Sequence, residues 1–373
     1  MSMLVRNNNA GICGAAAAAP SAESHRNPAR SGPTGGTGAE VWGSARWRAT
    51  ATGWLDAQLA SAGIRRTGPV EQPHLRPWAT VLTTPTTAGP VWLKATGPAT
   101  AFEAGLSELL SRVVPEHVLA PIAVDLSRGW LLLPDGGPPL ADRLAGTDLA
   151  DALAAVLRRY AQLQRAFAAS AGAALALGVA DMRAQVMPAR FDEAVETVGR
   201  LVVGRGDAIG RDALGEVATL RATYRSWCAR LAPAPGAASL DHNDLHPWNM
   251  LVPRLDRPGQ VRFYDWGDAV VAHPFACMLV PLSWAQHRLG TGLDAPELHR
   301  IRDAYLDVFS DLAPHAELVE TLQLACRVAK VARSLTWARA IAQSDPGELS
   351  DHHAIAPLAC LRSLRDASYI GGA

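Results

Sequence analysis

Residues 241–249 read Asp-His-Asn-Asp-Leu-His-Pro-Trp-Asn, and Asp-Trp-Gly-Asp follows at 265–268. Between these two segments lie two short strand-like runs, 250–252 and 261–264. If the runs pair as a hairpin, the residue that enters it, Asn249, and the residue that leaves it, Asp265, lie side by side at its open end. The sequence therefore predicts an amide and a carboxylate that share one site.

The residue types around this hairpin are those that phosphoryl transfer requires. Amide and carboxylate oxygens suit Mg²⁺, which takes few protein ligands and completes its shell with phosphate and water. Asp244 lies in the loop just before the hairpin, so two carboxylates are expected at this site, and one of them is left over to receive a proton from a nucleophile. The reaction needs in-line positioning and neutralised phosphate charge, and little covalent chemistry from the protein.

The spacing His242-x-Asp244-x-x-x-x-Asn249, with Leu245-His246-Pro247 inside it, is followed by Tyr264-Asp265-Trp266. With these motifs the sequence resembles the aminoglycoside phosphotransferase/choline kinase group, small-molecule relatives of the protein kinases, over about residues 68–290. The resemblance implies an α+β, two-lobed protein-kinase-like fold: a small antiparallel β-sheet lobe with one key helix, and a large, mainly helical lobe that contains a short hairpin. It also implies that Asp244 orients or deprotonates the substrate hydroxyl, that Asn249 and Asp265 hold Mg²⁺, and that ATP is the donor.

Lysine is almost absent from the chain, since Lys94 and Lys330 are the only two among 35 basic residues. Lys94 ends the strand-like run 91–93, and a compact ammonium differs from a guanidinium fork as a phosphate ligand. By the kinase resemblance, Lys94 reaches the α- and β-phosphates, and Glu103, in the first turn of the next predicted helix, is its partner. Thr100-x-x-Glu103 is also a capping-box pattern, which would explain the glutamate without any catalytic role.

The same resemblance assigns the adenine-reading hinge to the backbone of residues 131–134, which includes Leu131 and Leu133. The sequence departs from the family pattern elsewhere. Asn243 stands where a glycine is usual and Trp248 where a small residue is common. The family's Gly-Asp-Pro and the Asp after it are replaced by Ala272-His273-Pro274 and Cys277, so the catalytic loop must be braced from elsewhere or more weakly. Residues 75–94 contain no glycine-rich phosphate loop, so the phosphate grip is expected to rest on Lys94 and metal.

The rest of the chain fits two lobes behind a leader. Residues 1–40 are rich in small and polar residues without an apolar face, so a disordered leader is expected. Residues 41–134 are expected to form the N-terminal nucleotide-binding lobe: a helix ending near Gly63, a hairpin of 78–82 and 91–94 around a turn at 83–90, a helix over 101–113, and strands at 118–124 and 130–133. Residues 135–373 are expected to form the C-terminal helical lobe with the catalytic loop and the acceptor site. Its predicted helices cover 148–176, 188–204, 211–232, 274–289, 295–311, 315–344 and 355–367.

Composition narrows the possible partners. The 373 residues carry 35 Lys+Arg and 35 Asp+Glu, a balance that gives no reason to expect binding to nucleic acid or acidic membranes. Five scattered cysteines indicate neither a disulfide framework nor a zinc knuckle. The uncharged, Ala-rich stretch 166–180 is too short to span a bilayer. Composition therefore favours a cytoplasmic protein that binds neither nucleic acid nor a membrane, and the resemblance implies an enzyme whose partner is a small molecule with a hydroxyl group.

The favoured hypothesis is an ATP- and Mg²⁺-dependent phosphotransferase that moves the γ-phosphate to a hydroxyl of an aminoglycoside-, choline- or sugar-like acceptor. Two alternatives stay open from the sequence. The first is a metal-dependent hydrolase, because the alternating side chains of His242, Asp244 and His246 could bind one metal ion. This alternative leaves Lys94 and Asn249 without a role, and the two histidines are otherwise expected to be structural. The other alternative is a kinase-like nucleotide-binding protein without catalysis.

Overall fold

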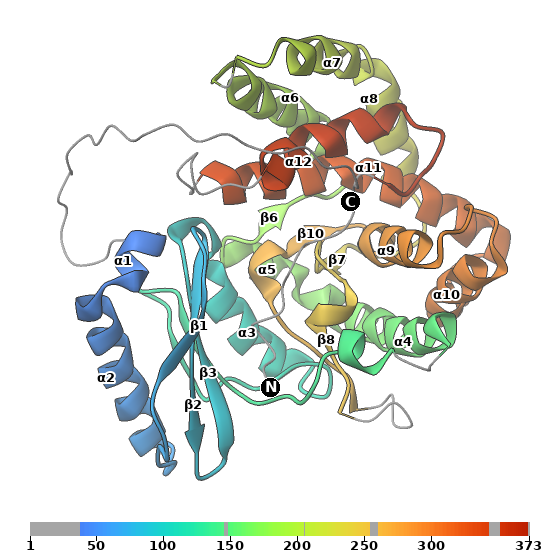
Figure 1. Cartoon of the computed structure of the whole chain (residues 1–373). Helices are drawn as coiled ribbons and strands as arrows, with labels where there is room; N and C mark the ends of the chain where they lie inside the picture. The colour runs from blue at the N-terminus through green and yellow to red at the C-terminus, as the bar shows by residue number, and fades with distance from the viewer. Residues whose placement is uncertain (1–37, 145–147, 205, 254–259, 343–350, 372–373) are drawn as a thin grey trace.

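The computed structural model describes residues 38–144, 148–204, 206–253, 260–342 and 351–371. The first 37 residues, which make up most of the predicted leader, lie outside this part of the chain. A five-stranded antiparallel sheet stands at one end of the molecule, and the long helices are gathered at the other (Figure 1). No helix in the described ranges combines the length and the apolar character that a membrane span needs.

The five-stranded sheet is sandwiched between two helices (Figure 1). Its strands are ordered β1-β2-β3-β5-β4, with bounds β1 Glu71–Leu75, β2 Ala79–Thr86, β3 Gly89–Thr96, β4 Ala123–Asp125 and β5 Trp130–Pro134. Alternate residues of β3, Val91, Leu93 and Ala95, pack with helix α2 (Ala45–Ser61), which follows the short helix α1 (Ala39–Gly43). Because side chains alternate along a strand, Lys94 points to the opposite face, toward helix α3 (Phe102–Val113).

The sheet departs from the prediction at two loops. Strands β2 and β3 continue through the predicted turn 83–90 and pair as far as Thr86 and Gly89, so the connection is only two residues long. The β-branched threonines of this stretch favour strand over turn. The predicted strand 118–124 shrinks to β4, because Pro121 cannot donate to a ladder, and Val118 makes an isolated bridge with Phe263 instead.

The helices of the larger lobe follow the predicted segments, except that 148–176 and 211–232 are each interrupted. Their bounds are α4 Leu149–Phe167, α5 Ala171–Ala176, α6 Met187–Gly204, α7 Ala208–Ala218, α8 Arg221–Leu231, α9 Leu279–Leu289, α10 Pro296–Leu306, α11 His315–Ala342 and α12 Asp351–Arg362. Their apolar faces form one large core, which also takes in Leu106 and Leu110 of α3. The key helix of the small lobe is thereby anchored in the large one.

Two small sheets lie within the helical lobe. The predicted hairpin is present as β8 (Met250–Leu251) and β9 (Arg262–Phe263), with Met250 opposite Phe263. A three-stranded sheet, ordered β6-β10-β7, was not predicted. Its bounds are β6 Ala180–Asp181, β7 Ser239–Asp241 and β10 Val270–Ala272. This sheet holds both ends of the segment that contains Asp244 and Asp265.

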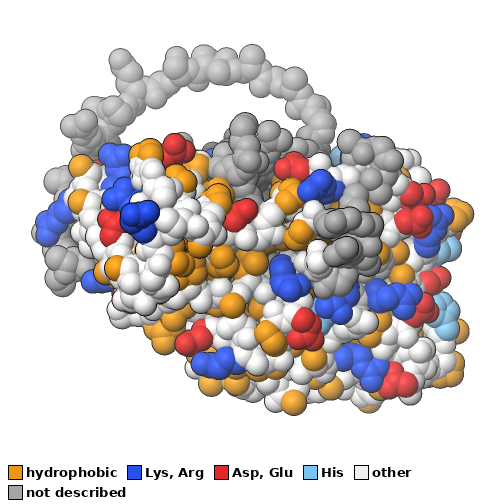
Figure 2. All heavy atoms as spheres, turned by 90° about the horizontal axis from the view of Figure 1, so that it is seen from below, with side chains coloured by type: hydrophobic (Ala, Val, Ile, Leu, Met, Phe, Trp, Pro, Cys, Tyr) orange, Lys and Arg blue, Asp and Glu red, His pale blue; other side chains and the backbone are white. Residues whose placement is uncertain are grey.

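The small lobe packs directly on the hairpin. Val81 and Trp92 of the large sheet are buried against Leu251 and Tyr264, and these four residues form a core of their own between the lobes. Lys94 lies two residues beyond Trp92 on the same face of β3, so this contact fixes it relative to the hairpin that carries the predicted metal ligands. On the face drawn in Figure 2, basic and acidic side chains are interleaved, in keeping with the balanced charge of the sequence.

Candidate active site

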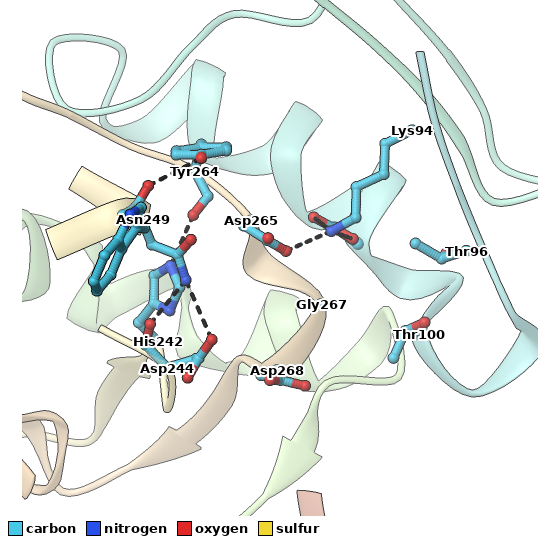
Figure 3. Close-up of polar contacts among 12 residues, drawn as sticks. Lys94, Thr96, Thr100, His242, Asp244, Asn249, Tyr264, Asp265, Gly267 and Asp268 are labelled. Atoms are coloured by element: carbon cyan, nitrogen blue, oxygen red, sulfur yellow. Dashed lines mark hydrogen bonds and ion pairs between the residues drawn. The ribbon is translucent and has the colours of Figure 1, made fainter. Parts of the chain in front are cut away.

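Lys94 is the centre of a buried ion-pair cluster between the lobes (Figure 3). Its Nζ lies 2.7 Å from Glu103 of α3 and 2.5 Å from Oδ1 of Asp265. Lys94 is only 8% exposed and Glu103 only 2%. Burial alone would lower the pKa of the ammonium, but the two carboxylates outweigh it and hold that pKa above its usual value. Lys94 is therefore a fixed positive charge between the lobes.

The structure resolves the two interpretations of Glu103. The capping box is not formed, because the residue that caps α3 is Ala101, which makes no side-chain bond, and the Thr100 hydroxyl donates to the Gly97 carbonyl. The carboxylate of Glu103 instead contacts Lys94. The expected contact between Lys94 and Glu103 is confirmed, and its role in nucleotide binding stays a prediction.

Asn249 and Asp265 lie at the same end of the β8–β9 hairpin, as its geometry predicts. The short 3₁₀ helix Pro247–Asn249 leads into β8, and the Tyr264 N–H donates to the Asn249 carbonyl at 3.5 Å. Asp265 adopts a left-handed backbone conformation with φ +67°, uncommon for a residue with a side chain and tolerated best by Asn and Asp. This turn directs its carboxylate toward Lys94.

The chemistry of this pair fits a divalent cation. Asn249 Nδ2 donates to the Asp244 backbone carbonyl at 2.9 Å and to Asp244 Oδ2 at 3.3 Å, which leaves Asn249 Oδ1 as the free end of the amide. That oxygen is buried and has no hydrogen-bond donor. A buried oxygen without a donor is costly, and together with the Asp265 carboxylate it forms a hard oxygen pair of the kind that Mg²⁺ takes when phosphates supply its other ligands.

Asp244 is held from several sides. Its Oδ1 accepts a hydrogen bond from Arg333 of α11 at 2.7 Å, and its Oδ2 lies 3.2 Å from His246 Nε2. Burial would raise the pKa of this carboxyl, but His246 and Arg333 hold it well below its usual range. The same contact raises the pKa of His246 against the effect of burial. Asp244 is therefore an ionised, oriented carboxylate.

The loop that contains Asp244 is braced from helix α11. The sequence lacks the family's Gly-Asp-Pro segment and the Asp after it, and α11 supplies this bracing instead. Asn243, at the position where the family has glycine, takes φ +58°. Its N–H donates to Asp241 Oδ1 at 2.7 Å, and its amide donates to Thr336 Oγ1 of α11 at 2.7 Å. Asparagine tolerates the left-handed conformation that otherwise favours glycine, and its side chain adds an anchor that glycine cannot provide.

In the described part of the chain, His242, Asp244 and His246 are not arranged as the three ligands of one metal site. His242 Nε2 lies 2.8 Å from the Tyr264 carbonyl, and its ring packs against Trp266 with centroids 4.7 Å apart. Burial lowers the pKa of His242, which keeps the ring neutral. Within the described ranges no three His, Cys, Asp or Glu side chains are placed to hold a metal ion. The alternating ligands expected for a hydrolase are thus not assembled.

The expected hinge residues lie inside the large sheet. Leu131 is opposite Lys94 in β3 and Val124 in β4, and Leu133 is opposite Trp92. Both side chains are buried. The pairing of β5 with β3 ends at Pro134, and the next N–H, that of Asp135, still donates to the Pro90 carbonyl at 3.1 Å. A ligand of this segment would therefore contact the backbone where it leaves the sheet.

Sequence reasoning missed several residues of the site. Arg333 and Arg339 both come from α11, and Arg339 donates to the Gly267 carbonyl at 2.9 Å and to Asp268 at 3.3 Å. Tyr160 of α4 accepts a hydrogen bond from the His242 N–H at 2.8 Å. No local sequence pattern identifies these residues, because they lie on α11 and α4, far from the loop in the sequence, and contact it only in the folded protein.

Comparison with known proteins agrees with this geometry. Residues 93–318 match the model of the phosphotransferase enzyme family. A choline/ethanolamine kinase family protein from Mesorhizobium loti is 17% identical with a TM-score of 0.52, covering 85% of this chain and 95% of its own. The macrolide 2'-phosphotransferase MphH from Brachybacterium faecium is 19% identical with a TM-score of 0.50, covering 83% and 97%. APH(2'')-IIa, in a ternary complex with streptomycin and ATP, is 11% identical with a TM-score of 0.52, covering 87% and 98%.

These similarities confirm the predicted α+β, protein-kinase-like fold. No curated protein matches the sequence.

Proposed function

Because this chain belongs to the phosphotransferase enzyme family, we propose that it transfers the γ-phosphoryl group of ATP, with Mg²⁺, to a hydroxyl group of a small molecule. The observation that supports this most directly is the convergence of the Glu103 and Asp265 carboxylates on the Lys94 ammonium, each within 2.7 Å. Asn249 and Asp244, which contact each other, lie beside Asp265. Donor-phosphate, metal and proton-accepting groups are thereby present together. Phosphoryl transfer needs these parts and little covalent chemistry.

On the donor side, Lys94 would contact the α- and β-phosphates while Glu103 keeps its ammonium in place. Asn249 Oδ1 and the Asp265 carboxylate would hold Mg²⁺, which when bound neutralises phosphate charge. In the structure Asp265 contacts Lys94. We expect the phosphates of bound ATP to replace Asp265 as the partner of the Lys94 ammonium. The backbone that follows Leu131 and Leu133 is the proposed contact for adenine.

On the acceptor side, Asp244 would orient the attacking hydroxyl. The hydroxyl oxygen forms a bond to the γ-phosphorus, the bond from that phosphorus to the bridging oxygen of ADP breaks, and the hydroxyl proton passes to Asp244. The low pKa of this carboxyl makes it a weak base, so orientation is its main contribution and the proton is transferred late. A loose transition state tolerates this order, because little charge leaves the nucleophile early.

The acceptor would be an aminoglycoside-, choline- or sugar-like molecule bound by the helical lobe. Trp248, which directly precedes Asn249, is partly exposed and meets Trp284 of α9 edge to face with ring centroids 6.1 Å apart. Indole faces of this kind stack on flat apolar surfaces and attract cations. These two rings are the first candidates for contact with the acceptor.

The test is ADP release in the presence of Mg-ATP and a panel of hydroxyl compounds, with the phosphorylated product identified by mass. We expect D244A and D265A to lower turnover by about 10²-fold or more. Asp307, an exposed carboxylate paired with Arg158 at the surface, supplies the matched control D307A, which should turn over normally.

Wild-type turnover in D244A or D265A would contradict the proposal. Tight nucleotide binding without transfer to any acceptor in the panel would favour the non-catalytic alternative.

A further inference from the structure

Both terminal nitrogens of Arg333 donate to the loop that contains Asp244. The Arg333 side chain is 5% exposed, although it is one of the longest charged side chains a helix can carry. Its Nη1 donates to the Asn243 carbonyl and its Nη2 to Asp244 Oδ1, each at 2.7 Å. The guanidinium lies over the ring of Trp337, one turn further along α11, at 5.1 Å from its centroid. Both ends of the fork are therefore engaged by two consecutive residues of one loop.

We propose that Arg333 is a positioning residue that holds Asp244 through Oδ1, so that Oδ2 is the oxygen that receives the proton of the acceptor hydroxyl. This inference rests on the proposed phosphoryl transfer. The contacts of Oδ2 are longer, 3.2 Å to His246 Nε2 and 3.3 Å to Asn249 Nδ2. A short charge-assisted bond to Oδ1 removes the freedom of the carboxylate to rotate, and Oδ2, whose two contacts are longer and weaker, is the oxygen that faces the acceptor.

The guanidinium of Arg333 also connects the loop that contains Asp244 with the loop that contains Asp265. Arg333 Nη1 lies 3.8 Å from Asp268 Oδ2, and Arg339 contacts the other oxygen of the same carboxylate. Asp268 ends the 3₁₀ helix that begins directly after Asp265. Helix α11 thus touches both the loop of Asp244 and the loop of Asp265, and the distance between acceptor oxygen and donor phosphate depends on it.

Orientation explains this arginine better than stability does. A buried ion pair adds little net stability compared with apolar packing, because both ions lose their hydration. A lysine at this place would carry the charge without the planar fork that reaches a carbonyl and a carboxylate together. The two hydrogen bonds of Arg333 are therefore suited to hold the Asp244 carboxylate in one orientation.

The experiment compares R333A and R333K with R327A. Arg327 is the matched control, because it lies on the same helix, donates to the Asp366 and Ala367 carbonyls at 2.9 and 2.7 Å, and covers Trp227 at 5.2 Å, all away from the site. We expect kcat of R333A to fall about 100-fold, the loss that a misplacement near 1 Å produces. The KM for ATP should stay near its wild-type value, because Lys94 and Asp265 are untouched.

Added guanidinium ion should restore part of kcat in R333A, and R333K should fall between R333A and the wild type. R327A should lose thermal stability and keep kcat. Wild-type kcat in R333A, or parallel losses of kcat in R333A and R327A without guanidinium rescue, would overturn the inference. If R333A does not fold, R333K decides: normal kcat refutes the need for the fork, and reduced kcat with normal KM supports it. A wild-type chain that transfers no phosphate would refute the proposed function itself, a distinct result.

Discussion

At the scale of single residues, Lys94 combines two effects that a pair of substitutions can separate. In K94M the proposed phosphate contact is lost, and we expect kcat/KM for ATP to fall about 100-fold, as on removal of one preorganised donor. Glu103 is then left buried without a counter-ion, beside Asp265, which costs about 3–5 kcal/mol of stability. Thermal unfolding and steady-state kinetics measure the two losses independently.

The second substitution, in K94M/E103Q, removes the unpaired charge at Glu103. We expect the double variant to regain most of the thermal stability and none of the activity, because the ammonium is still missing. Recovery of turnover together with stability would show that Lys94 acts only as a structural partner of Glu103.

Residue-scale prediction worked where the chemistry is local. Asp244, Asn249 and Asp265 are brought together by one short hairpin, whose open end can be located from spacing alone. Arg333 lies 89 residues from Asp244 and reaches it only because α11 packs beside the loop. Its neighbours on α11 give no periodic signal that distinguishes it from a surface arginine, so the sequence could not identify it.

At the scale of elements, Lys330 ties helix α11 to the end of the chain and makes stability depend on pH. Its Nζ donates to the Ser363 and Ser368 carbonyls at 2.9 Å each, a set that a neutral amine with two N–H bonds satisfies. Burial, and secondarily Arg327, lower its pKa from 10.5 to about 8. Between these two values the unfolded chain binds more protons than the folded one, so the contribution of Lys330 to stability rises with pH.

The wild type and K330M should therefore diverge as the pH increases. We expect the difference in unfolding free energy, wild type minus K330M, to increase by about 1–3 kcal/mol between pH 7 and pH 10. Taking the difference removes the contributions of buried tyrosines and cysteines, which titrate in the same range and act in the opposite direction. Denaturant titrations at several pH values measure it, and a difference that is independent of pH would contradict the assignment.

Element-scale prediction succeeded for the long helices and for the β8–β9 hairpin, and failed for the three-stranded sheet β6-β10-β7. The amphipathic segments of α4 and α6 extend over several turns, so their periodicity identifies them. Strands β6, β7 and β10 have two or three residues each and are stabilised by partners far along the chain, such as Val270 beside Ala180. A run that short carries no alternation to detect.

At the scale of the whole molecule, the chain has separate cores whose substitution should have different consequences. Leu55 of α2 is fully buried in the core between that helix and the outer face of the sheet. Leu251 of β8 is equally buried, but in the small core that joins the sheet to the hairpin. The two leucines are matched in type and burial, but only Leu251 lies in the core between the two lobes.

Both L55A and L251A should lose about 2–5 kcal/mol of stability, because each leaves a cavity in a packed core. Only L251A should also lower kcat/KM, by about 10- to 100-fold, since the cavity lets the strand of Lys94 shift against Asn249 and Asp265. Calorimetry gives the two midpoints, and kinetics are measured well below the lower one. Equal catalytic losses in both variants would mean that stability alone controls activity, and an unaffected L251A would mean that the inter-lobe core does not set the site. The expected split arises because Lys94, the proposed phosphate ligand, lies on one lobe, whereas Asn249 and Asp265, the proposed metal ligands, lie on the other. The packing between the lobes therefore sets the geometry of the proposed active site.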